Sequence, residues 1–268
     1  MAKKKYAIGV DMGASFTKIG LVDENGNISN ETELSTTDYK TPKNFVDALA
    51  LQVQLIAGIA PGEVSGVGIG APNANYHSGA INNSANLPWK EYFPLRDMLM
   101  EAIDMPVKIT NDAKAAAQGE LLFGKAKGMK DFILLTLGTG VGSGIVSNGQ
   151  LVYGHDGMAG ELGHIIAKPN GRPCGCGRKG CLETYASATG ILNTAQKIMM
   201  ANGLIPFQTS REITEAAMIG NPMCIPFCPP RRSSFSEDWP MPGIFSWCLQ
   251  GRLLKKNYYL STKRTNPN

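Results

Sequence analysis

The chain has 268 residues, of which 43% are apolar and 18% are charged, as is typical of a folded globular protein. Its net charge of +4 is uneven, because residues 221–268 carry seven of the 26 basic side chains and two of the 22 acidic ones. Residues 1–220 are therefore near −1 and lack the basic stripe that nucleic-acid binding needs. No apolar run reaches the about 18 residues of a membrane helix, and Asp11 interrupts the N-terminal segment where a signal peptide would need its apolar core. We expect a cytoplasmic protein, without nucleic-acid or membrane partners, whose cysteines are reduced.

Two segments of the chain share one plan: an apolar strand, a glycine-rich turn, a second strand and an Asn-Gly hairpin turn. The first segment ends at Asn25-Gly26, and the second, about 125 residues later, ends at Asn148-Gly149. A single hairpin of this kind is common in β-rich domains. Two copies predict a duplicated nucleotide-handling unit.

Strands alternate with helices between and after these copies, which predicts an α/β protein. One helix begins near Pro42, and its buried face is predicted to hold Phe45, Leu49, Val53 and Ile56. The remaining predicted elements are a strand that runs into a loop over 63–73, a strand and an Ala-rich helix over 106–124, and helices within 186–203 and 209–221.

Both glycine-rich turns have features of a phosphate-binding loop. In the first, residues 11–18, Gly13 lets the backbone approach an anion, and Asp11 could hold Mg²⁺ directly or through water. Its spacing is not that of a Walker loop. The second, residues 138–144, has four glycines in seven positions, which favours a phosphate-binding turn over a plain hairpin.

Asn111 and Asp112 stand between a predicted strand and a predicted helix. They could serve only as a helix N-cap. The Asp112 carboxylate, kept ionised by the helix dipole, could also accept a proton from a substrate hydroxyl, and the two roles are compatible. The sequence thus offers Asp11 and Asp112 as separate carboxylates for metal binding and base catalysis.

Three cysteines follow a histidine with the spacing His-x9-Cys-x-Cys-x4-Cys. The four residues are His164, Cys174, Cys176 and Cys181. A redox Cys-x-x-Cys pair is absent, and a nucleophilic cysteine would not need two companions, so a closed structural zinc site is favoured over these roles and over chance clustering. Zinc would bring together Glu161 and Glu183, which with Asn111 and Asp112 could accept hydrogen bonds from a polyhydroxylated ligand.

Taken together, these motifs resemble the ROK family (repressors, uncharacterised reading frames and sugar kinases). The matching stretches occur in family order over residues 6 to about 220, and they are DMGASFTKIG, GIGAPN, NLPW, ITNDAKAAAQGE, LTLGTGVGSGIV, GMAGELGH and CGCGRKGCLETYAS. The resemblance implies an α/β, actin-like fold of the hexokinase type (ribonuclease H-like), with two domains and a cleft between them. It also implies ATP- and Mg²⁺-dependent phosphorylation of a hexose, most often glucose at its 6-hydroxyl.

The resemblance assigns a role to each motif residue. Asp112 matches the catalytic base. The residues that match sugar contacts are Asn86, Asn111, Asp112, Glu161, His164 and Glu183. The residues that match zinc ligands are His164, Cys174, Cys176 and Cys181, with the second ring nitrogen of His164 toward the sugar. The residues that match phosphate handling are Gly13, Thr17, Lys18, Gly138, Thr139 and Gly140, and Asp11 matches the Mg²⁺-organising position.

Several alternatives stay open under this resemblance. The sugar could instead be fructose, mannose, allose or an N-acetylhexosamine, and polyphosphate could replace ATP as donor. A homodimer is one assembly that the resemblance allows. A repressor is disfavoured, because the first phosphate turn begins by residue 11 and leaves no room for a preceding helix-turn-helix.

The resemblance divides the chain into an N-terminal α/β domain over 1–112, the start of a larger C-terminal α/β domain over 113–220, and an atypical tail over 221–268. The tail has seven prolines and three cysteines in 48 residues, without helical periodicity or the Gly-Gly turn that packs against adenosine in the family. This break favours a shifted reading frame over a divergent C-terminus. A kinase-inactive, sugar-binding remnant of the family is therefore the alternative function.

Overall fold

The computed structural model describes residues 4–82, 87–218 and 258–260. The predicted sugar contact Asn86 lies outside the described residues, and so does the predicted tail over 221–268, apart from Tyr258–Leu260. The described chain forms two compact units. The first unit holds the described residues up to Leu134 together with Ser143–Gly160 and Tyr259–Leu260, and the second holds Leu135–Gly142 together with the described residues from Glu161 to Tyr258.

The first unit is built on a five-stranded sheet with the order β3-β2-β1-β4-β5. Its strands are β1 (Lys5–Met12), β2 (Phe16–Asp23), β3 (Ile28–Ser35), β4 (Glu63–Ala71) and β5 (Val107–Asn111). The β1–β2 and β2–β3 pairs are antiparallel, whereas β4 runs parallel to both β1 and β5. Alternate side chains of β1 are buried, namely Ile8, Val10 and Met12, as expected of a strand that packs one face against a core.

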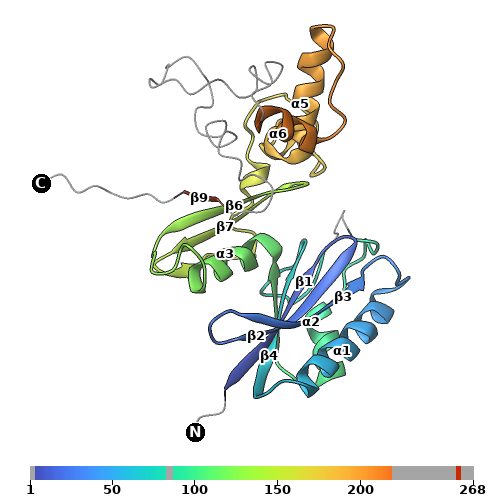
Figure 1. The fold of residues 1–268 in the computed structure, drawn as a ribbon, viewed down its shortest axis with the longest axis vertical. Coiled ribbons are helices and arrows are strands. Elements are labelled where there is room, and N and C mark those ends of the chain that lie inside the picture. The colour runs from blue at the N-terminus through green and yellow to red at the C-terminus, as the bar shows by residue number, and fades with distance from the viewer. Residues whose placement is uncertain (1–3, 83–86, 219–257, 261–268) are drawn as a thin grey trace, which may run out of the picture. The chain divides into compact units, whose positions relative to one another are not determined.

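Helices α1 (Pro42–Gly58) and α2 (Leu95–Ile103) pack against each other in the first unit (Figure 1). The predicted start of α1 is confirmed, because Pro42 lies in its first turn and the Thr41 side chain accepts a hydrogen bond from the Asn44 N–H at 3.2 Å. The predicted apolar face of α1 is also confirmed, since all four of its residues are buried. Helix α3 (Asp112–Leu122) is the predicted Ala-rich helix and packs on β4 and β5.

The second copy of the hairpin plan is confirmed by β6 (Phe132–Leu137), β7 (Val141–Ser147) and β8 (Gln150–Leu151). Asn148 and Gly149 both have positive φ, 52° and 74°, as a two-residue hairpin turn requires. The second sheet has the order β8-β7-β6-β9, with β9 at Tyr258–Leu260. The remaining helices are the 3-10 helix η1 (Leu162–His164), α4 (Glu183–Ala186), α5 (Ala188–Ala201) and α6 (Ser210–Met218).

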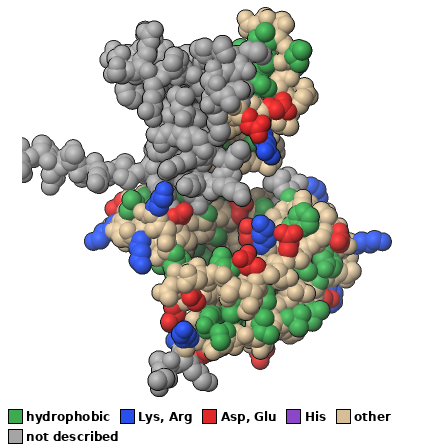
Figure 2. All heavy atoms as spheres, in the orientation of Figure 1, with side chains coloured by type: hydrophobic (Ala, Val, Ile, Leu, Met, Phe, Trp, Pro, Cys, Tyr) green, Lys and Arg blue, Asp and Glu red, His purple; other side chains and the backbone are tan. Residues whose placement is uncertain are grey.

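Charged side chains on the described surface contribute little to holding this fold together. Ion pairs such as Lys43–Asp47, at 2.8 Å, join exposed side chains, and exposed pairs of this kind stabilise by at most about 1 kcal/mol. On the face in Figure 2, Lys and Arg side chains lie apart from one another among acidic and apolar ones. Within the described part of the chain, the helices fall short of the length and apolarity needed to cross a bilayer.

We predict that Gly144→Ala destabilises the first unit by about 1–3 kcal/mol. A Cβ at Gly144 would overlap the Ala117 Cβ on α3 and lie 3.2 Å from the Ala113 carbonyl oxygen, so α3 would have to shift. Gly68→Ala is the matched control, since a Cβ there meets nothing within 4 Å. Urea unfolding of both variants measures the difference, and an equal loss of stability would contradict the packing argument.

Candidate functional site

The carboxyl ends of β1 and β5 bring the two predicted aspartates into one region of the first unit. Asp11, near the end of β1, pairs with Gly70 of β4, and the next β4 residue, Ala71, pairs with Asn111 of β5. Partial burial of the Asp11 carboxylate raises its pKa, the negative charge of Asp112 raises it further, and Lys18 opposes the shift. The two carboxylates therefore interact electrostatically.

Asn111 and Asp112 form the N-terminus of α3. The Asn111 side chain is the N-cap, and its Oδ1 accepts hydrogen bonds from the Ala113 and Lys114 N–H groups at 3.0 and 3.3 Å. Asp112 is exposed in the first turn of the helix, and its Oδ1 also accepts a hydrogen bond from the Ala113 N–H, at 2.8 Å. The capping role is confirmed for Asn111.

Two threonine side chains support the first glycine-rich turn. Gly13 N–H donates to the Phe16 carbonyl at 2.9 Å, and a Cβ on Gly13 would lie 2.7 Å from that oxygen, so the turn requires glycine. Thr17 is fully buried, with its hydroxyl 2.9 Å from the Thr36 hydroxyl, and Thr36 donates to the Gly13 carbonyl at 3.0 Å. Thr17 thus supports the shape of the turn, while Lys18 lies exposed across the strand pair from Asp11.

Residues 138–142 of the second glycine-rich turn lie in the second unit, where three hydrogen bonds hold them. Gly138 N–H donates to the Gly140 carbonyl at 3.0 Å, and the Gly138 carbonyl accepts from the Ala188 N–H at the start of α5 at 2.9 Å. The Val141 N–H donates to Oε2 of Glu183 at 3.0 Å. A Cβ on Gly140 would lie 2.5 Å from that same oxygen, so the turn and Glu183 fit closely.

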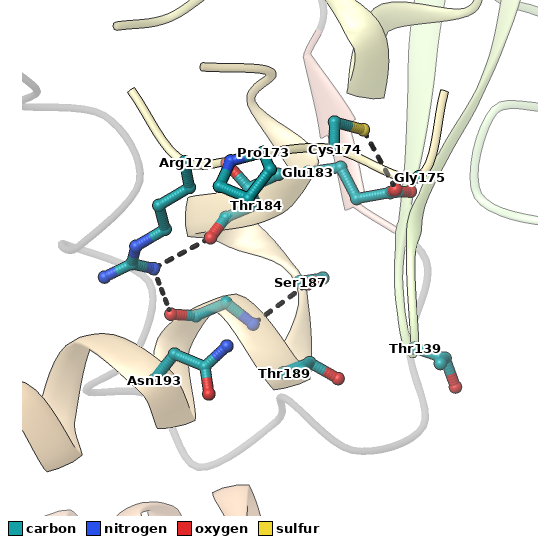
Figure 3. Close-up of a pocket in the computed structure, with 11 residues that line it drawn as sticks. Thr139, Arg172, Pro173, Cys174, Gly175, Glu183, Thr184, Ser187, Thr189 and Asn193 are labelled. Atoms are coloured by element: carbon teal, nitrogen blue, oxygen red, sulfur yellow. Dashed lines mark hydrogen bonds between the residues drawn. The ribbon is translucent and has the colours of Figure 1, made fainter. Parts of the chain in front are cut away.

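A cavity of about 420 Å³ opens beside this turn, within the second unit (Figure 3). Its lining includes Thr139 of the turn, Cys174, Glu183 and, from helix α5, Thr189 and Asn193. The Ser187 side chain caps α5 by accepting from the Gly190 N–H at 3.0 Å. A glycine turn beside the N-terminal end of a helix is an arrangement that suits an anion.

The four predicted metal ligands gather in the second unit. Their ligand atoms all lie within 4.8 Å of one another; Cys176 Sγ is 3.7 Å from Cys181 Sγ, and Cys174 Sγ is 3.6 Å from His164 Nδ1. Bonds of about 2.3 Å to sulfur and about 2.0 Å to nitrogen place neighbouring ligands of a tetrahedral zinc ion about 3.6–3.8 Å apart. The set fits a structural zinc ion, with Nδ1 as the histidine ligand.

The thiols of this set differ in acidity. Hydrogen bonds from the Arg178 backbone and side chain lower the pKa of Cys176 to about 6, whereas burial raises the pKa of Cys174 to about 11. Zinc binds thiolates, so a bound ion would supply the positive charge that ionises Cys174. Glu161 lies at the N-cap of η1 and is exposed, three residues before His164.

Some residues that shape these sites carry no sequence signal. Thr36 supports the first turn only through the pairing of β2 with β3, and Ser187 caps α5 from an unremarkable Ala-Ser-Ala stretch. Lys114 lies in an Ala-rich helix yet is buried. Thr36 and Lys114 acquire their roles through contacts with residues distant in the chain, and Ser187 acquires its role from its position at the start of a helix.

We expect the purified chain to hold about one zinc ion and Cys181→Ser to lose it, because the buried Cys181 cannot be replaced by solvent. Inductively coupled plasma mass spectrometry counts the ion. Cys228→Ser, in the tail outside the described residues, is the matched control and should keep it. Equal zinc content in the two variants would refute the assignment.

We predict that Asp11→Asn raises the melting temperature at pH 7 by on the order of 1–2 °C without metal. The folded pKa of Asp11 lies above its ordinary 3.8, so the ionised carboxylate destabilises the fold at neutral pH, and this penalty fades as both states become protonated at lower pH. The gain should therefore shrink on acidification.

Asp23→Asn is the control for which the opposite change in melting temperature is expected. The Asn27 side chain and backbone lower the pKa of Asp23, so its ionised form stabilises the fold above its unfolded pKa. Removing that charge should lower the melting temperature at pH 7. Thermal scans at several pH values test both signs, and a destabilising Asp11→Asn would contradict the electrostatic argument.

Known proteins share these motifs and this architecture. The chain is 41% identical to a glucokinase of Halalkalibacterium halodurans over 199 residues, which cover 71% of this chain and 59% of that protein. It is 36% identical to an N-acetylmannosamine kinase of Citrobacter koseri over 192 residues, which cover 70% of this chain and 64% of that protein. A crystal structure of a ROK family glucokinase from Streptomyces griseus, in complex with glucose and AMPPNP, superposes with a TM-score of 0.67 at 34% identity, covering 82% of this chain and 73% of that one.

The chain thus spans less than two thirds of the length of these two kinases. Its described architecture is the α/β, actin-like fold of the hexokinase type that ROK glucokinases share. The ROK family model matches residues 7–227, which is most of the chain. The chain therefore belongs to the ROK family.

Proposed function

We propose that this chain is an ATP- and Mg²⁺-dependent sugar kinase whose preferred substrate is glucose. The observation that carries the proposal is the position of Asp112, exposed at the dipole-positive end of α3 and electrostatically coupled to Asp11. Phosphoryl transfer needs one carboxylate to accept a proton from the attacking hydroxyl and another to organise the metal. These two aspartates supply both from one region of the first unit.

In this proposal Asp112 acts as the general base. It orients the 6-hydroxyl of the sugar and takes its proton as the oxygen attacks the γ-phosphorus. Asn111 fixes the first turn of α3, because its Oδ1 is occupied by two backbone N–H groups. The direction of the Asp112 side chain is thereby set by the helix start, which limits reorganisation during the reaction.

The phosphate donor is assigned to the two glycine-rich turns. Close backbone approach is possible at Gly13, and the cavity beside Thr139 has the N-terminal end of α5 in its wall. Mg²⁺, held through Asp11 when bound, neutralises charge on the transferred phosphoryl group. The backbone N–H groups of the turns then have the role of stabilising the remaining charge.

The sugar is assigned to acceptors that lie within or flank residues 164–181, the segment of the four zinc ligands, here called the cysteine loop. With Nδ1 of His164 directed at Cys174, Nε2 is the ring nitrogen left for a sugar hydroxyl. Glu183 accepts from Val141 through Oε2, so we assign Oε1 to the sugar; it lies 3.9 Å from Cys174 Sγ, which would no longer donate to it as a zinc-bound thiolate. The similarity to glucokinases favours glucose, and the similarity to N-acetylmannosamine kinases makes an N-acetylhexosamine the next substrate to test.

A sugar-binding protein without kinase activity is the second candidate. The observation that favours it is the sequence over 221–268, which lacks the Gly-Gly turn expected of the family's adenosine-binding part. Sugar and zinc binding rest on residues before 184 and do not need that part. The two candidates therefore differ in ATP turnover alone.

The deciding experiment is a coupled ADP-release assay on this 268-residue chain. Mg·ATP is supplied with glucose, fructose, mannose, N-acetylglucosamine or N-acetylmannosamine in parallel, with a no-sugar blank. Turnover on one sugar supports the kinase and identifies its substrate. Absence of turnover in folded, zinc-containing protein that binds a sugar by calorimetry would replace the kinase with the second candidate.

We predict that Asp112→Asn lowers kcat by about 10²–10⁴-fold while the sugar dissociation constant changes by only a few-fold. The amide keeps the shape and one hydrogen bond of the carboxylate but cannot take the proton. Asp97→Asn, on an exposed side chain of α2, is the control and should leave kcat unchanged. Undiminished turnover in Asp112→Asn would rule out its role as base.

A further inference from the structure

The segment Tyr153–Gly160, here called the entry loop, has its backbone held by side chains from two other parts of the first unit. Lys114 Nζ donates to the Gly157 carbonyl at 2.6 Å, and Asn75 Nδ2 donates to the Asp156 carbonyl at 2.7 Å. His77 Nε2 lies 3.0 Å from the Gly154 carbonyl. Side chains thus supply the hydrogen bonds that a helix or sheet would provide.

The path of the entry loop is also fixed by its glycines and its aromatic side chain. Gly154, Gly157 and Gly160 have φ of 77°, 80° and 88°, a region that disfavours other residues. A Cβ at Gly157 would lie 2.6 Å from Asn75 Nδ2. The Tyr153 ring stacks on Tyr76 with centroids 4.1 Å apart and planes 16° apart. The loop therefore packs on residues 75–77 in a single, closely fitted arrangement.

Lys114 is the unusual member of this arrangement. It lies on α3 two residues after Asp112 and is only 2% exposed. Its buried ammonium donates to the Gly157 carbonyl at 2.6 Å, and a hydrogen bond from a charged donor is stronger than one from a neutral donor. A methionine of similar length could not make this bond.

We propose that Lys114 and Asn75 are positioning residues that hold the entry loop to α3 and to the segment after β4. The entry loop ends at Gly160, and the next residue is Glu161, which the proposed function assigns to the sugar. The inference rests on that assignment. By fixing where the chain enters the Glu161–His164 turn, the two side chains set the sugar affinity without touching the sugar.

The test combines hydrogen–deuterium exchange with kinetics on Lys114→Met and Asn75→Ala in the full chain. Amide protons of residues 153–160, including Ala159 N–H, which donates to the Tyr153 carbonyl at 3.0 Å, should exchange about tenfold faster in both variants. The KM for glucose should rise about tenfold, while the KM for ATP stays unchanged. Lys127→Met is the matched control on an exposed lysine and should change neither.

Melting temperature and zinc content check that each variant is folded. Asn75→Ala keeps the proposal testable if Lys114→Met does not fold. Unchanged exchange in the folded variants, or faster exchange with an unchanged sugar KM, would overturn the proposal. If the parent chain turns over no sugar, its sugar dissociation constant replaces KM, so failure of the kinase assignment and failure of the positioning role are read separately.

Discussion

Parallel pairing of β1, β4 and β5 is the constraint on which the first unit's chemistry depends. Strands that run in the same direction end at the same edge, so residues far apart in sequence meet there. Asp11 and Asp112 come into one region through this pairing, and the Asp112 charge adds to the larger effect of burial in raising the pKa of Asp11. The proposed metal-organising role of Asp11 would offset this repulsion, because a nearby cation favours an ionised carboxylate.

The second unit reaches its geometry by different means, because its functional segments are loops. Backbone hydrogen bonds within the cysteine loop position these segments, together with the four gathered metal ligands, whereas a sheet edge does so in the first unit. Glu183 connects the parts of this unit, since Oε2 accepts from Val141 in the glycine turn and Oε1 lies 3.9 Å from Cys174 Sγ. Metal binding and the shape of the second glycine-rich turn are therefore linked through one carboxylate. A zinc ion here would affect this turn as well as the cysteine loop.

The sequence alone was sufficient where the determining signal is local. The alternating apolar residues of β1, the helical stripe of α1 and the spacing of the cysteines each depend on neighbours in the chain, and the structure confirms these elements and gathers the four ligands. Lys114 shows where such reasoning stops. A lysine in an Ala-rich helix is typical of a solvated face, and its burial is decided by a loop 43 residues later. Helix α2 is not among the predicted elements, although Leu95, Leu99 and Ile103 follow helical spacing.

The small residues of α3 explain how one helix can serve both the proposed base and the entry loop. Ala115 lies against Gly70 of β4, with a Cβ on that glycine only 3.0 Å away, and Ala117 lies against Gly144 of β7. Short side chains on both partners let the backbones approach closely, so the helix start that carries Asp112 is rigidly placed. Lys114 departs from this rule by inserting a long, charged side chain among small ones. Burial and the Asp112 charge raise the pKa of Asp11, so its ionised carboxylate disfavours folding, which is the expected pattern when stability is exchanged for function.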